Sequence, residues 1–478
     1  MTNALRQIAK QNKKQTTFMG IENTSSRYIT ELVKAQRAYF REGATLGTEF
    51  RREMLKRLLN ALHTWEKPLM EALWQDLHKS YEEALLTEIS IVSVEIKNHL
   101  KNLDSWVEDE ERHTPFKLFP SRSKIITEPL GNTLIIAPWN YPVQLLLNPL
   151  VGAISAGCTA ILKPSPYVPN VARVLGQMID DTFDERYIAV VQGNREVNKE
   201  LLAQRFDLIF FTGSPSLGKQ VMEAAAKHLT PVVLELGGKS PCIVDKEADI
   251  RLAAKRIAWG KSINAGQTCI APDYLLVHSA VKEAFVKELQ RQFKSLLGDN
   301  PKESKHFVRI VNERAFARLV SYLDNGEIRF GGKYDAQERY IEPTLLDNVL
   351  PDAPVMQEEI FGPIFPLLTF ERTEEAVKFI NNREKPLALY YFGSTKRADR
   401  VLRGTSSGGA CINDVIMHIA NEDMPFGGVG NSGMSSYHGK ESLLAFSHRR
   451  SVLTSSTKID LPFRYMPYRW LWLAKWFL

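Results

Sequence analysis

Cysteine is scarce in this sequence, which includes only four: Cys158, Cys242, Cys269 and Cys411. No two of them form a C-x-x-C pair, and none lies among histidines at the spacing of metal ligands. Disulfide frameworks and zinc sites need such pairs or clusters, so the pattern argues against both and favours a reducing, cytoplasmic setting. We therefore expect no metal site.

Long hydrophobic runs are also missing, because no segment reaches the roughly 18 apolar residues that a membrane-spanning helix needs. The first twenty residues, MTNALRQIAKQNKKQTTFMG, are basic and lack an apolar core. This argues against a secretory signal and predicts a flexible extension over residues 1–26. Neither charge sign dominates, since 61 Lys and Arg stand against 55 Asp and Glu. With no zinc-finger or RNA-binding motif present, we expect no nucleic-acid partner.

Apolar patterning predicts two consecutive α/β units. Residues 27–115 carry apolar side chains at three- and four-residue spacing, which predicts helices. Short apolar runs such as TLIIAP (133–138) and LIFFTG (208–213) then alternate with segments of helical length. This alternation predicts a parallel sheet covered on both faces, as in doubly wound nucleotide-binding domains. A second series of the same kind begins at PCIVD (241–245), and the length fits two or three packed domains.

Three loops carry candidate catalytic side chains. In NAGQTCIAP, Cys269 lies among small and polar residues, so it is either a nucleophile with a favoured thiolate or an inert loop thiol. In VVLELGGKSP, Glu235 ends an apolar strand and is either a general base of raised pKa or the ion-pair partner of Lys239. In APWNYPVQ, Asn140 either offers an amide to an oxyanion or makes an Asx turn before Pro142.

Two further loops are candidates for binding phosphate. KPSPYVP (163–169) and FTGSPSLGK (211–219) each lie where a predicted strand ends and a helix begins. Gly213 and Gly218 would let the backbone approach a phosphate, and the following helix would offer free N–H groups. The spacing is not G-x-G-x-x-G, so an ordinary turn remains the alternative.

The motifs APWNYP, KPSP, FTGS, LELGGKSP, GQTC, EEIFGP and PFGGVGNSG follow one another across about 300 residues. In this order and spacing they resemble the NAD(P)-dependent aldehyde dehydrogenase superfamily, from about residue 27 to 455. The tail INDVIMHIAN…MPFGGVGNSGMSSYHGKESLLAFSHRRSVL resembles the class 3 branch of that superfamily, which includes fatty aldehyde dehydrogenases.

The resemblance implies an enzyme that oxidises medium- or long-chain aldehydes to carboxylic acids. Cys269 would add to the aldehyde to give a thiohemiacetal, while the Asn140 amide and the Cys269 backbone N–H hold the oxyanion. Glu235 would activate the water that hydrolyses the resulting thioester. Aromatic aldehydes and apocarotenals remain alternative substrates. Glu235 argues against a CoA-acylating enzyme, and the presence of all three residues argues against a non-catalytic relative.

The resemblance also assigns residues to the cofactor and the substrate. Lys163 is expected near the adenosine ribose, Glu359 at the nicotinamide ribose and Phe361 near the nicotinamide ring. The other expected cofactor contacts are Trp139, Gly213, Ser214, Gly218, Gly237 and Gly238. Many NAD-selective relatives have Glu where this chain has Pro166, so we expect both NAD and NADP to be accepted. An apolar substrate tunnel is expected along Tyr141, Ile416, Met417 and His418, for which ordinary packing is the alternative.

The expected fold is therefore α/β, with a Rossmann-like cofactor-binding domain, an α/β catalytic domain and a small β oligomerisation arm. The predicted ranges are 27–105 and 131–235 for the cofactor-binding domain, 236–434 for the catalytic domain, and 106–130 and 435–460 for the arm. A homodimer is implied by the resemblance. Residues 461–478 form an apolar aromatic segment with flanking cations, which suits a membrane surface. Packing of this segment on the dimer itself is the alternative.

Overall fold

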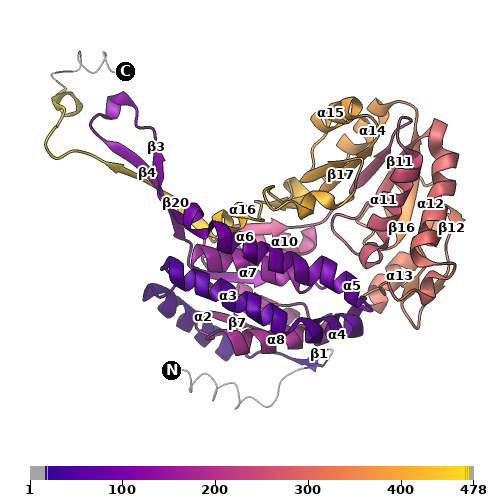
Figure 1. Cartoon of the computed structure of the whole chain (residues 1–478), viewed down its shortest axis with the longest axis horizontal. Helices are drawn as coiled ribbons and strands as arrows, with labels where there is room; N and C mark the ends of the chain where they lie inside the picture. The colour runs from indigo at the N-terminus through magenta and orange to yellow at the C-terminus, as the bar shows by residue number, and fades with distance from the viewer. Residues whose placement is uncertain (1–16, 19, 469, 471, 473–478) are drawn as a thin grey trace.

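The computed structural model describes residues 17–18, 20–468, 470 and 472 (Figure 1). Residues 1–16 and 19 of the predicted flexible extension lie outside the described residues. The remainder of that range is attached to the body of the molecule. Strand β1 (Thr17–Phe18) pairs with β2 (Ile21–Glu22), and the side chain of Ile21 is buried. Asn23 then accepts a hydrogen bond of 2.9 Å from the backbone of Asn194.

The first large sheet has six strands in the order β19-β9-β8-β5-β6-β7, and all neighbours except β19 and β9 run parallel. Its strands are β5 (Asn132–Ile136), β6 (Thr159–Lys163), β7 (Ile188–Val190), β8 (Leu208–Thr212), β9 (Val232–Glu235) and β19 (Gly433–Met434). The chain starts at β5, proceeds outward to β7 and then returns to the other side of β5. Such a reversal leaves a crevice at the carboxyl ends of β5 and β8, where doubly wound sheets bind their ligands.

Helices cover both faces of this sheet because successive strand residues alternate between them. Ile135 belongs to the apolar cluster that includes residues of α7 and α8, whereas Leu134 and Ile136 belong to the cluster with residues of α2, α9 and α10. The helices of this part are α2 (Ser26–Arg41), α3 (Thr48–Thr64), α4 (Glu66–Leu77), α5 (Tyr81–Ala84), α6 (Ser90–Val107), α7 (Gln144–Ala156), α8 (Pro169–Thr182), α9 (Arg195–Leu202) and α10 (Pro215–Ala226). A π-helical turn, Leu85–Ile89, joins α5 to α6.

The second large sheet has seven strands in the order β12-β15-β16-β11-β10-β17-β18. Its strands are β10 (Pro241–Val244), β11 (Tyr274–His278), β12 (Glu327–Phe330), β15 (Thr344–Asp347), β16 (Ile364–Phe370), β17 (Ala388–Phe392) and β18 (Gly409–Ile412). Its helices are α11 (Ile250–Ser262), α12 (Lys282–Leu297), α13 (Glu313–Ser321), α14 (Thr373–Asn381) and α15 (Thr395–Gly404). A short hairpin, β13 (Tyr334–Asp335) with β14 (Tyr340–Ile341), accompanies it. The predicted α/β fold, with a Rossmann-like unit followed by a second α/β unit, is therefore confirmed.

A third, antiparallel sheet combines two distant segments of the chain in the order β20-β4-β3. Its strands are β3 (Glu110–Arg112), β4 (Arg122–Pro129) and β20 (Ser447–Thr454), and the short helix α16 (Lys440–Ala445) precedes β20. Figure 1 shows this sheet extending away from both large units. These strands lie within the two ranges for which the oligomerisation arm is predicted.

The C-terminal segment is described in part, because residues 469, 471 and 473–478 lie outside the description. Tyr465, Tyr468, Trp470 and Trp472 are each about half exposed, at 47–60%. Among the described residues, no helix is both long and apolar enough to cross a membrane.

Candidate active site

Cys269 lies in the loop between α11 and β11, at the amino edge of the second sheet. The loop begins with a tight turn, in which Asn264 and Ala265 adopt positive φ angles of 50° and 51°. Such angles are unfavourable for residues other than glycine and occur where surrounding contacts impose them, often at functional sites. Cys269 is only partly exposed, and it lines a cavity of about 640 Å³.

The surroundings of Cys269 disfavour its thiolate. Burial, followed by the charges of Glu359 and Glu235, raises the pKa of the Cys269 thiol well above its usual range. Hydrogen bonds from the Cys269 and Ile270 backbone act in the opposite direction but are weaker. In the free protein the neighbours of Cys269 thus disfavour the thiolate, and the choice between a nucleophile and an inert thiol stays a prediction. Ionisation of this thiol requires a base.

Glu235 lies at the carboxyl end of β9, in the first sheet, and is 3% exposed. Neither of its carboxylate oxygens has a hydrogen-bond partner among the described residues. Burial raises the pKa of this carboxyl well above its usual range. The alternative of an ion pair with Lys239 is wrong, because Lys239 pairs with Asp273 instead. Glu235 is thus free to exchange a proton with a group that enters the site.

Asn140 lies in the loop that leads from β5 to α7 and is 2% exposed. Its side-chain Nδ2 donates a hydrogen bond of 3.1 Å to the carbonyl oxygen of Gln267, two residues before Cys269. The amide therefore bonds across to the cysteine loop and does not form the Asx turn that the sequence left open. Since an amide nitrogen carries two hydrogens, one donor remains for another acceptor.

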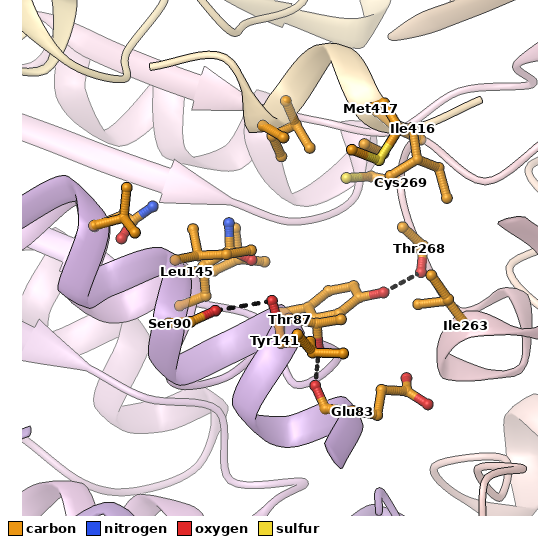
Figure 2. Close-up of a pocket in the computed structure, with 18 of the residues that line it drawn as sticks. Glu83, Thr87, Ser90, Tyr141, Leu145, Ile263, Thr268, Cys269, Ile416 and Met417 are labelled. Carbon is orange, nitrogen blue, oxygen red and sulfur yellow. Dashed lines mark hydrogen bonds between the residues drawn. The ribbon is translucent and has the colours of Figure 1, made fainter. Parts of the chain in front are cut away.

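Tyr141 and Thr268 connect the same two loops on the cavity side, where their hydroxyl oxygens are 2.7 Å apart. Figure 2 shows Tyr141 between Glu83 and Thr268, with Cys269 beyond Thr268 and close to Ile416 and Met417. The cavity wall is largely apolar, and Leu145 and Ile263 contribute to it. Three of the four residues expected along a substrate tunnel, Tyr141, Ile416 and Met417, thus line the cavity that reaches Cys269.

His418, the fourth residue, is not among the described residues that line this cavity. Its Nδ1 lies 3.3 Å from the sulfur of Cys411, and its ring stacks near Phe426 with 5.9 Å between ring centroids. Burial lowers the pKa of His418 to about 4, so the imidazole is neutral at physiological pH. Its surroundings are those of a packed histidine.

The residues expected around the cofactor lie along the carboxyl edge of the first sheet. Lys163 ends β6, is 1% exposed, and donates to the carbonyl oxygen of Pro164 at 2.8 Å. Burial lowers the pKa of its amine to about 7. Ser214 is the N-cap residue of α10, yet its side chain does not cap the helix. Pro215 at the start of α10 has no N–H, and the Leu217 N–H donates to the Ser214 carbonyl oxygen at 3.1 Å, so it is the Ser216 N–H at this helix end that fits the pyrophosphate of a dinucleotide.

At two positions of this edge, close packing leaves room for glycine and for no larger residue, which the sequence alone did not indicate. A Cβ on Gly213 would lie 2.6 Å from the ring of Phe211, and a Cβ on Gly218 would lie 2.8 Å from Leu236. Gly218 therefore lets α10 pack closely on the sheet, as the last glycine of dinucleotide-binding turns does. On the other side of the crevice, a Cβ on Gly237 would collide with the carboxylate of Glu359.

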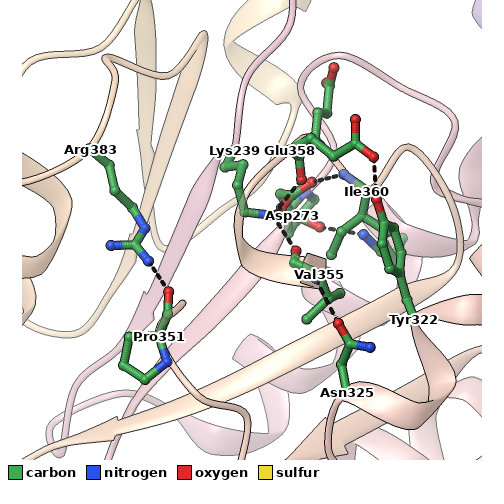
Figure 3. Close-up of polar contacts among 12 residues, drawn as sticks. Lys239, Asp273, Tyr322, Asn325, Pro351, Val355, Glu358, Ile360 and Arg383 are labelled. Atoms are coloured by element: carbon green, nitrogen blue, oxygen red, sulfur yellow. Dashed lines mark hydrogen bonds and ion pairs between the residues drawn. The ribbon is translucent and has the colours of Figure 1, made fainter. Parts of the chain in front are cut away.

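The loop on either side of Glu359 is held by a network on the second unit, and Figure 3 shows Lys239 and Asp273 next to Glu358 and Ile360. Lys239 pairs with Asp273 and also donates to the carbonyl oxygens of Val355, at 2.8 Å, and Glu358, at 3.0 Å. The other oxygen of Asp273 accepts from the Ile360 backbone at 2.8 Å.

Further contacts fix the same loop. Arg318 donates to the Glu359 carbonyl oxygen at 3.1 Å, and burial raises the pKa of the Glu359 carboxyl to about 8. The neighbouring Phe361 has a positive φ of 51° and meets Trp139 edge to face, with centroids 5.4 Å apart. Trp139 and Phe361 therefore join the two units at the crevice.

Three charged residues under the site were missed by the sequence reasoning. Lys79 and Glu88 form a 2.7 Å ion pair with both side chains 0% exposed, and Glu83 lines the cavity. They lie in the segment from the end of α4 to the π-helical turn, and nothing in the local sequence pattern marks their charged side chains as buried. Among the described residues, no group of three or more His, Cys, Asp or Glu is arranged to hold a metal ion.

Comparisons with known proteins agree with this geometry. The family model described as "Aldehyde dehydrogenase family" matches residues 3–452. The 4,4'-diaponeurosporen-aldehyde dehydrogenase of Staphylococcus aureus is 48% identical over 436 residues, which cover 91% of this chain and 95% of that protein. The dimeric NADP-preferring aldehyde dehydrogenase of Rattus norvegicus is 45% identical, over 90% of this chain and 95% of that protein.

Among solved structures, the substrate-bound state of Staphylococcus aureus AldH superposes with a TM-score of 0.92 at 46% sequence identity. The match covers 94% of this chain and 99% of that one. The likeness therefore includes both large units and not the Rossmann-like unit alone.

Proposed function

This chain belongs to the aldehyde dehydrogenase family, and we propose that it oxidises apolar aldehydes to carboxylic acids with Cys269 as the nucleophile. The observation that carries this proposal is the position of Cys269. It lies where an apolar cavity of about 640 Å³ meets the ligand-binding edge of a doubly wound sheet. A substrate that enters through the cavity and a dinucleotide bound at the sheet edge would thus meet at this sulfur.

Covalent addition comes first. The sulfur of Cys269 bonds to the aldehyde carbon, and its proton passes to Glu235, whose oxygens have no hydrogen-bond partner within the described part of the chain. The negative charge that develops on the aldehyde oxygen is held by the free Asn140 amide hydrogen and the Cys269 backbone N–H. Loss of one such donor lowers the rate by about 10²–10³.

NAD(P), the cofactor of the family, supplies the acceptor for the hydride that leaves the tetrahedral carbon. The residues that would hold it are Lys163, Ser214 and the α10 N-terminus at one end, and Trp139, Gly237, Gly238, Glu359 and Phe361 at the other. Glu235 then passes the proton taken from Cys269 to solvent and is again a carboxylate. In the next step it removes a proton from water, which attacks the thioester carbon. The carbon–sulfur bond breaks, the acid is released, and the Cys269 thiolate takes the proton back from Glu235. Hydrolysis by water is favoured over transfer to CoA because Glu235 is available as this base.

The substrate is proposed to be a medium- or long-chain aliphatic aldehyde. The largely apolar wall formed by residues such as Leu145, Ile263 and Ile416 supports a long alkyl group. Aromatic aldehydes and apocarotenals are the second candidate, favoured by the name of the Staphylococcus aureus relative, a diaponeurosporen-aldehyde dehydrogenase. The two candidates share the chemistry at Cys269 and differ only in what fills the cavity.

The decisive experiment measures initial rates of NAD reduction with alkanals of increasing length, one aromatic aldehyde and one apocarotenal. Each methylene that enters the apolar cavity should raise kcat/KM about three- to fourfold, until the cavity is filled. A preference for the apocarotenal would show that the second candidate, and not the aliphatic aldehyde, is the substrate class. No turnover with any of them would contradict the proposal, and Cys269→Ser serves as the inactive control.

We also propose that both NAD and NADP are accepted. Pro166 leaves no carboxylate at the position that repels the 2′-phosphate in many NAD-selective relatives. The name of the NADP-preferring rat relative supports this proposal. Turnover with NAD and none with NADP under the same conditions would contradict it.

The remaining proposals concern assembly. We propose a homodimer and keep the domain ranges predicted from the sequence, with residues 106–130 and 435–460 as the oligomerisation arm.

The exposed aromatic side chains of the C-terminal segment support contact with a membrane surface. In a liposome flotation assay, removal of the residues after Pro462 should abolish binding. Equal binding by the truncated protein would contradict the membrane proposal.

A further inference from the structure

A pair of opposite charges is completely buried beneath the candidate active site. Lys79 and Glu88 are each 0% exposed, and Lys79 Nζ lies 2.7 Å from Glu88 Oε1. Burial of two charges carries a large desolvation penalty, and a buried ion pair often adds little to stability compared with apolar residues. The Lys79–Glu88 pair therefore needs an explanation other than stability. The backbone groups to which the two side chains also bond indicate what the pair does.

Two departures from regular helix geometry bring these residues inside. His78, which ends α4, has a left-handed φ of 58°, so the chain turns and directs Lys79 into the core. Glu88 lies in the π-helical turn Leu85–Ile89. π-helical turns are rare and are frequent at functional sites. The short segment between these two features, residues 79–88, is called the clamp segment below.

Both members of the pair bond to the backbone of the Asn140 loop. Lys79 Nζ donates to the Asn140 carbonyl oxygen at 3.1 Å. Glu88 Oε2 accepts from the backbone N–H groups of Val143, at 2.9 Å, and Gln144, at 3.2 Å. The ammonium group of Lys79 also lies 4.3 Å from the centre of the Tyr141 ring. The pair thus fixes this loop at both ends.

A third charged residue of the clamp segment bonds to the cysteine loop. Glu83 Oε1 accepts from the Asn264 backbone N–H at 2.7 Å, within the turn that has positive φ angles. The Asn264 side chain in turn donates to the carbonyl oxygens of Asn140, at 2.9 Å, and Gln267, at 3.0 Å. Glu83 therefore reaches the Asn140 loop through Asn264 as well.

We propose that Lys79, Glu83 and Glu88 are positioning residues that fix the oxyanion-binding amide of Asn140 relative to the sulfur of Cys269. The proposal rests on the function proposed above. One segment bonds to both catalytic loops, so its rigidity determines the distance between amide and sulfur. A displacement of about 1 Å at a reacting group lowers the rate by about 10²-fold. This role explains why the charges are buried: they keep the two loops, and therefore the Asn140 amide and the Cys269 sulfur, in a fixed relative position.

The test compares variants of the clamp segment in the full-length protein. Lys79→Met should lower kcat with a saturating alkanal by about 10²-fold, and should change KM for the aldehyde much less. Glu83→Leu should act in the same direction, and Glu83→Gln should restore activity because an amide oxygen still accepts from Asn264. The Glu83 variants decide the question if Lys79→Met does not fold.

A second readout separates positioning of the amide from damage to the nucleophile. Alkylation of Cys269 by iodoacetamide displaces iodide at an sp³ carbon and forms no oxyanion. Its rate should therefore stay within about twofold of wild type in Lys79→Met and Glu83→Leu. The matched control is Asp207→Asn, a partly buried carboxylate that pairs with Arg37 and accepts from the Asn132 backbone at the amino ends of β5 and β8, away from the cavity and from both catalytic loops. Its kcat should not change.

The outcomes are distinct. Unchanged kcat in Lys79→Met and Glu83→Leu, with an active wild-type enzyme, would overturn this proposal. Alkylation rates that fall in parallel with kcat would also overturn it, because they would place the defect at the sulfur. A wild-type enzyme with no aldehyde oxidation would instead overturn the proposed function.

Discussion

The Cys269 thiol lies near two carboxyl groups, and this determines its chemistry in the free protein. Reactive cysteines usually have a lowered pKa because a cation or helix N-terminus stabilises the thiolate. Here burial and the charges of Glu359 and Glu235 raise the pKa of Cys269. These surroundings therefore favour the protonated thiol in the free protein. A base at the site, for which Glu235 is placed, must remove the proton when substrate is present.

This arrangement predicts how alkylation of Cys269 depends on pH and on Glu359. Because the thiol is largely protonated, the rate with iodoacetamide should rise steadily from pH 7 to pH 9.5 without a plateau. Glu359→Gln removes a carboxylate that is mostly ionised at pH 9, since its pKa is about 8. The variant should react about fivefold faster than wild type at pH 9. A plateau near pH 8, or no acceleration in the variant, would contradict this account.

Glu83 should make the protein less stable as the pH rises. Burial raises the pKa of its carboxyl to about 7 from an ordinary value of 4.5. Between those values the unfolded chain releases its proton while the folded protein keeps it, so the free energy of unfolding falls with increasing pH. Glu83→Gln should therefore gain about 1–3 kcal/mol over wild type at pH 8 and little at pH 4.5. Thermal unfolding midpoints at both pH values provide the measurement, and an equal gain at both would contradict the prediction.

The sequence reveals the proposed catalytic residues more readily than the residues proposed to position them. Cys269, Glu235 and Asn140 each lie in a short motif of glycine, proline and small residues. Each motif taken singly leaves an ordinary structural alternative, and only their joint order and spacing resemble a known family. Lys79 lies in the short connection between α4 and α5, and Glu88 in the π-helical turn Leu85–Ile89, where single charges normally face solvent. Their burial follows from the Asn140 loop packed over them, which is an interaction between distant parts of the chain and has no local pattern.

At the scale of elements, the alternation of apolar strands and helices predicted both large sheets, because parallel strands covered on two faces are almost wholly apolar. The same reasoning did not anticipate the π-helical turn Leu85–Ile89 or the left-handed turn at Asn264 and Ala265. Both depart from the preferred backbone geometry of their own residues. They are maintained by contacts with other elements, which periodicity does not report.

The loop between β15 and β16 should control cofactor affinity through Asp273. Asp273 holds Lys239 and the Ile360 backbone, and these hold the loop that carries Glu359 (Figure 3). Asp273→Asn weakens the pairing with Lys239, so Glu359 loses its fixed position. We expect KM for NAD to rise about tenfold while kcat at saturating NAD changes less than about threefold.

The control for this element is Arg383→Met, which removes a guanidinium that donates to the carbonyl oxygen of Pro351 near the start of the same loop. Its KM for NAD should stay within about twofold of wild type. If Asp273→Asn lowers kcat as strongly as it raises KM, the loop acts on the chemical step and the cofactor-positioning role is wrong.

At the scale of the molecule, the candidate site exists only where two units meet. Glu235, Lys163 and Ser214 come from the carboxyl edge of the first sheet, whereas Cys269 and Glu359 come from loops of the second unit. Trp139 and Phe361 make contact across the junction. Each edge is readable from its own strand pattern. The relative orientation of the two sheets depends on packing between them, and for that the sequence offered only the resemblance to a family.

The small sheet β20-β4-β3 provides the last prediction, because it extends from the molecule with apolar side chains facing solvent. Phe116 and Leu453 are 71% and 49% exposed. A sheet of three strands has little core of its own, so burial of such residues against a second copy would stabilise it. Phe116→Asp combined with Leu453→Asp should convert the expected dimer to monomer in sedimentation velocity experiments at micromolar concentration. The control, Leu229→Asp, alters a 91% exposed leucine outside this sheet and should leave the dimer intact. A wild-type monomer, or a dimer that survives the double substitution, would show that this sheet is not the oligomerisation arm.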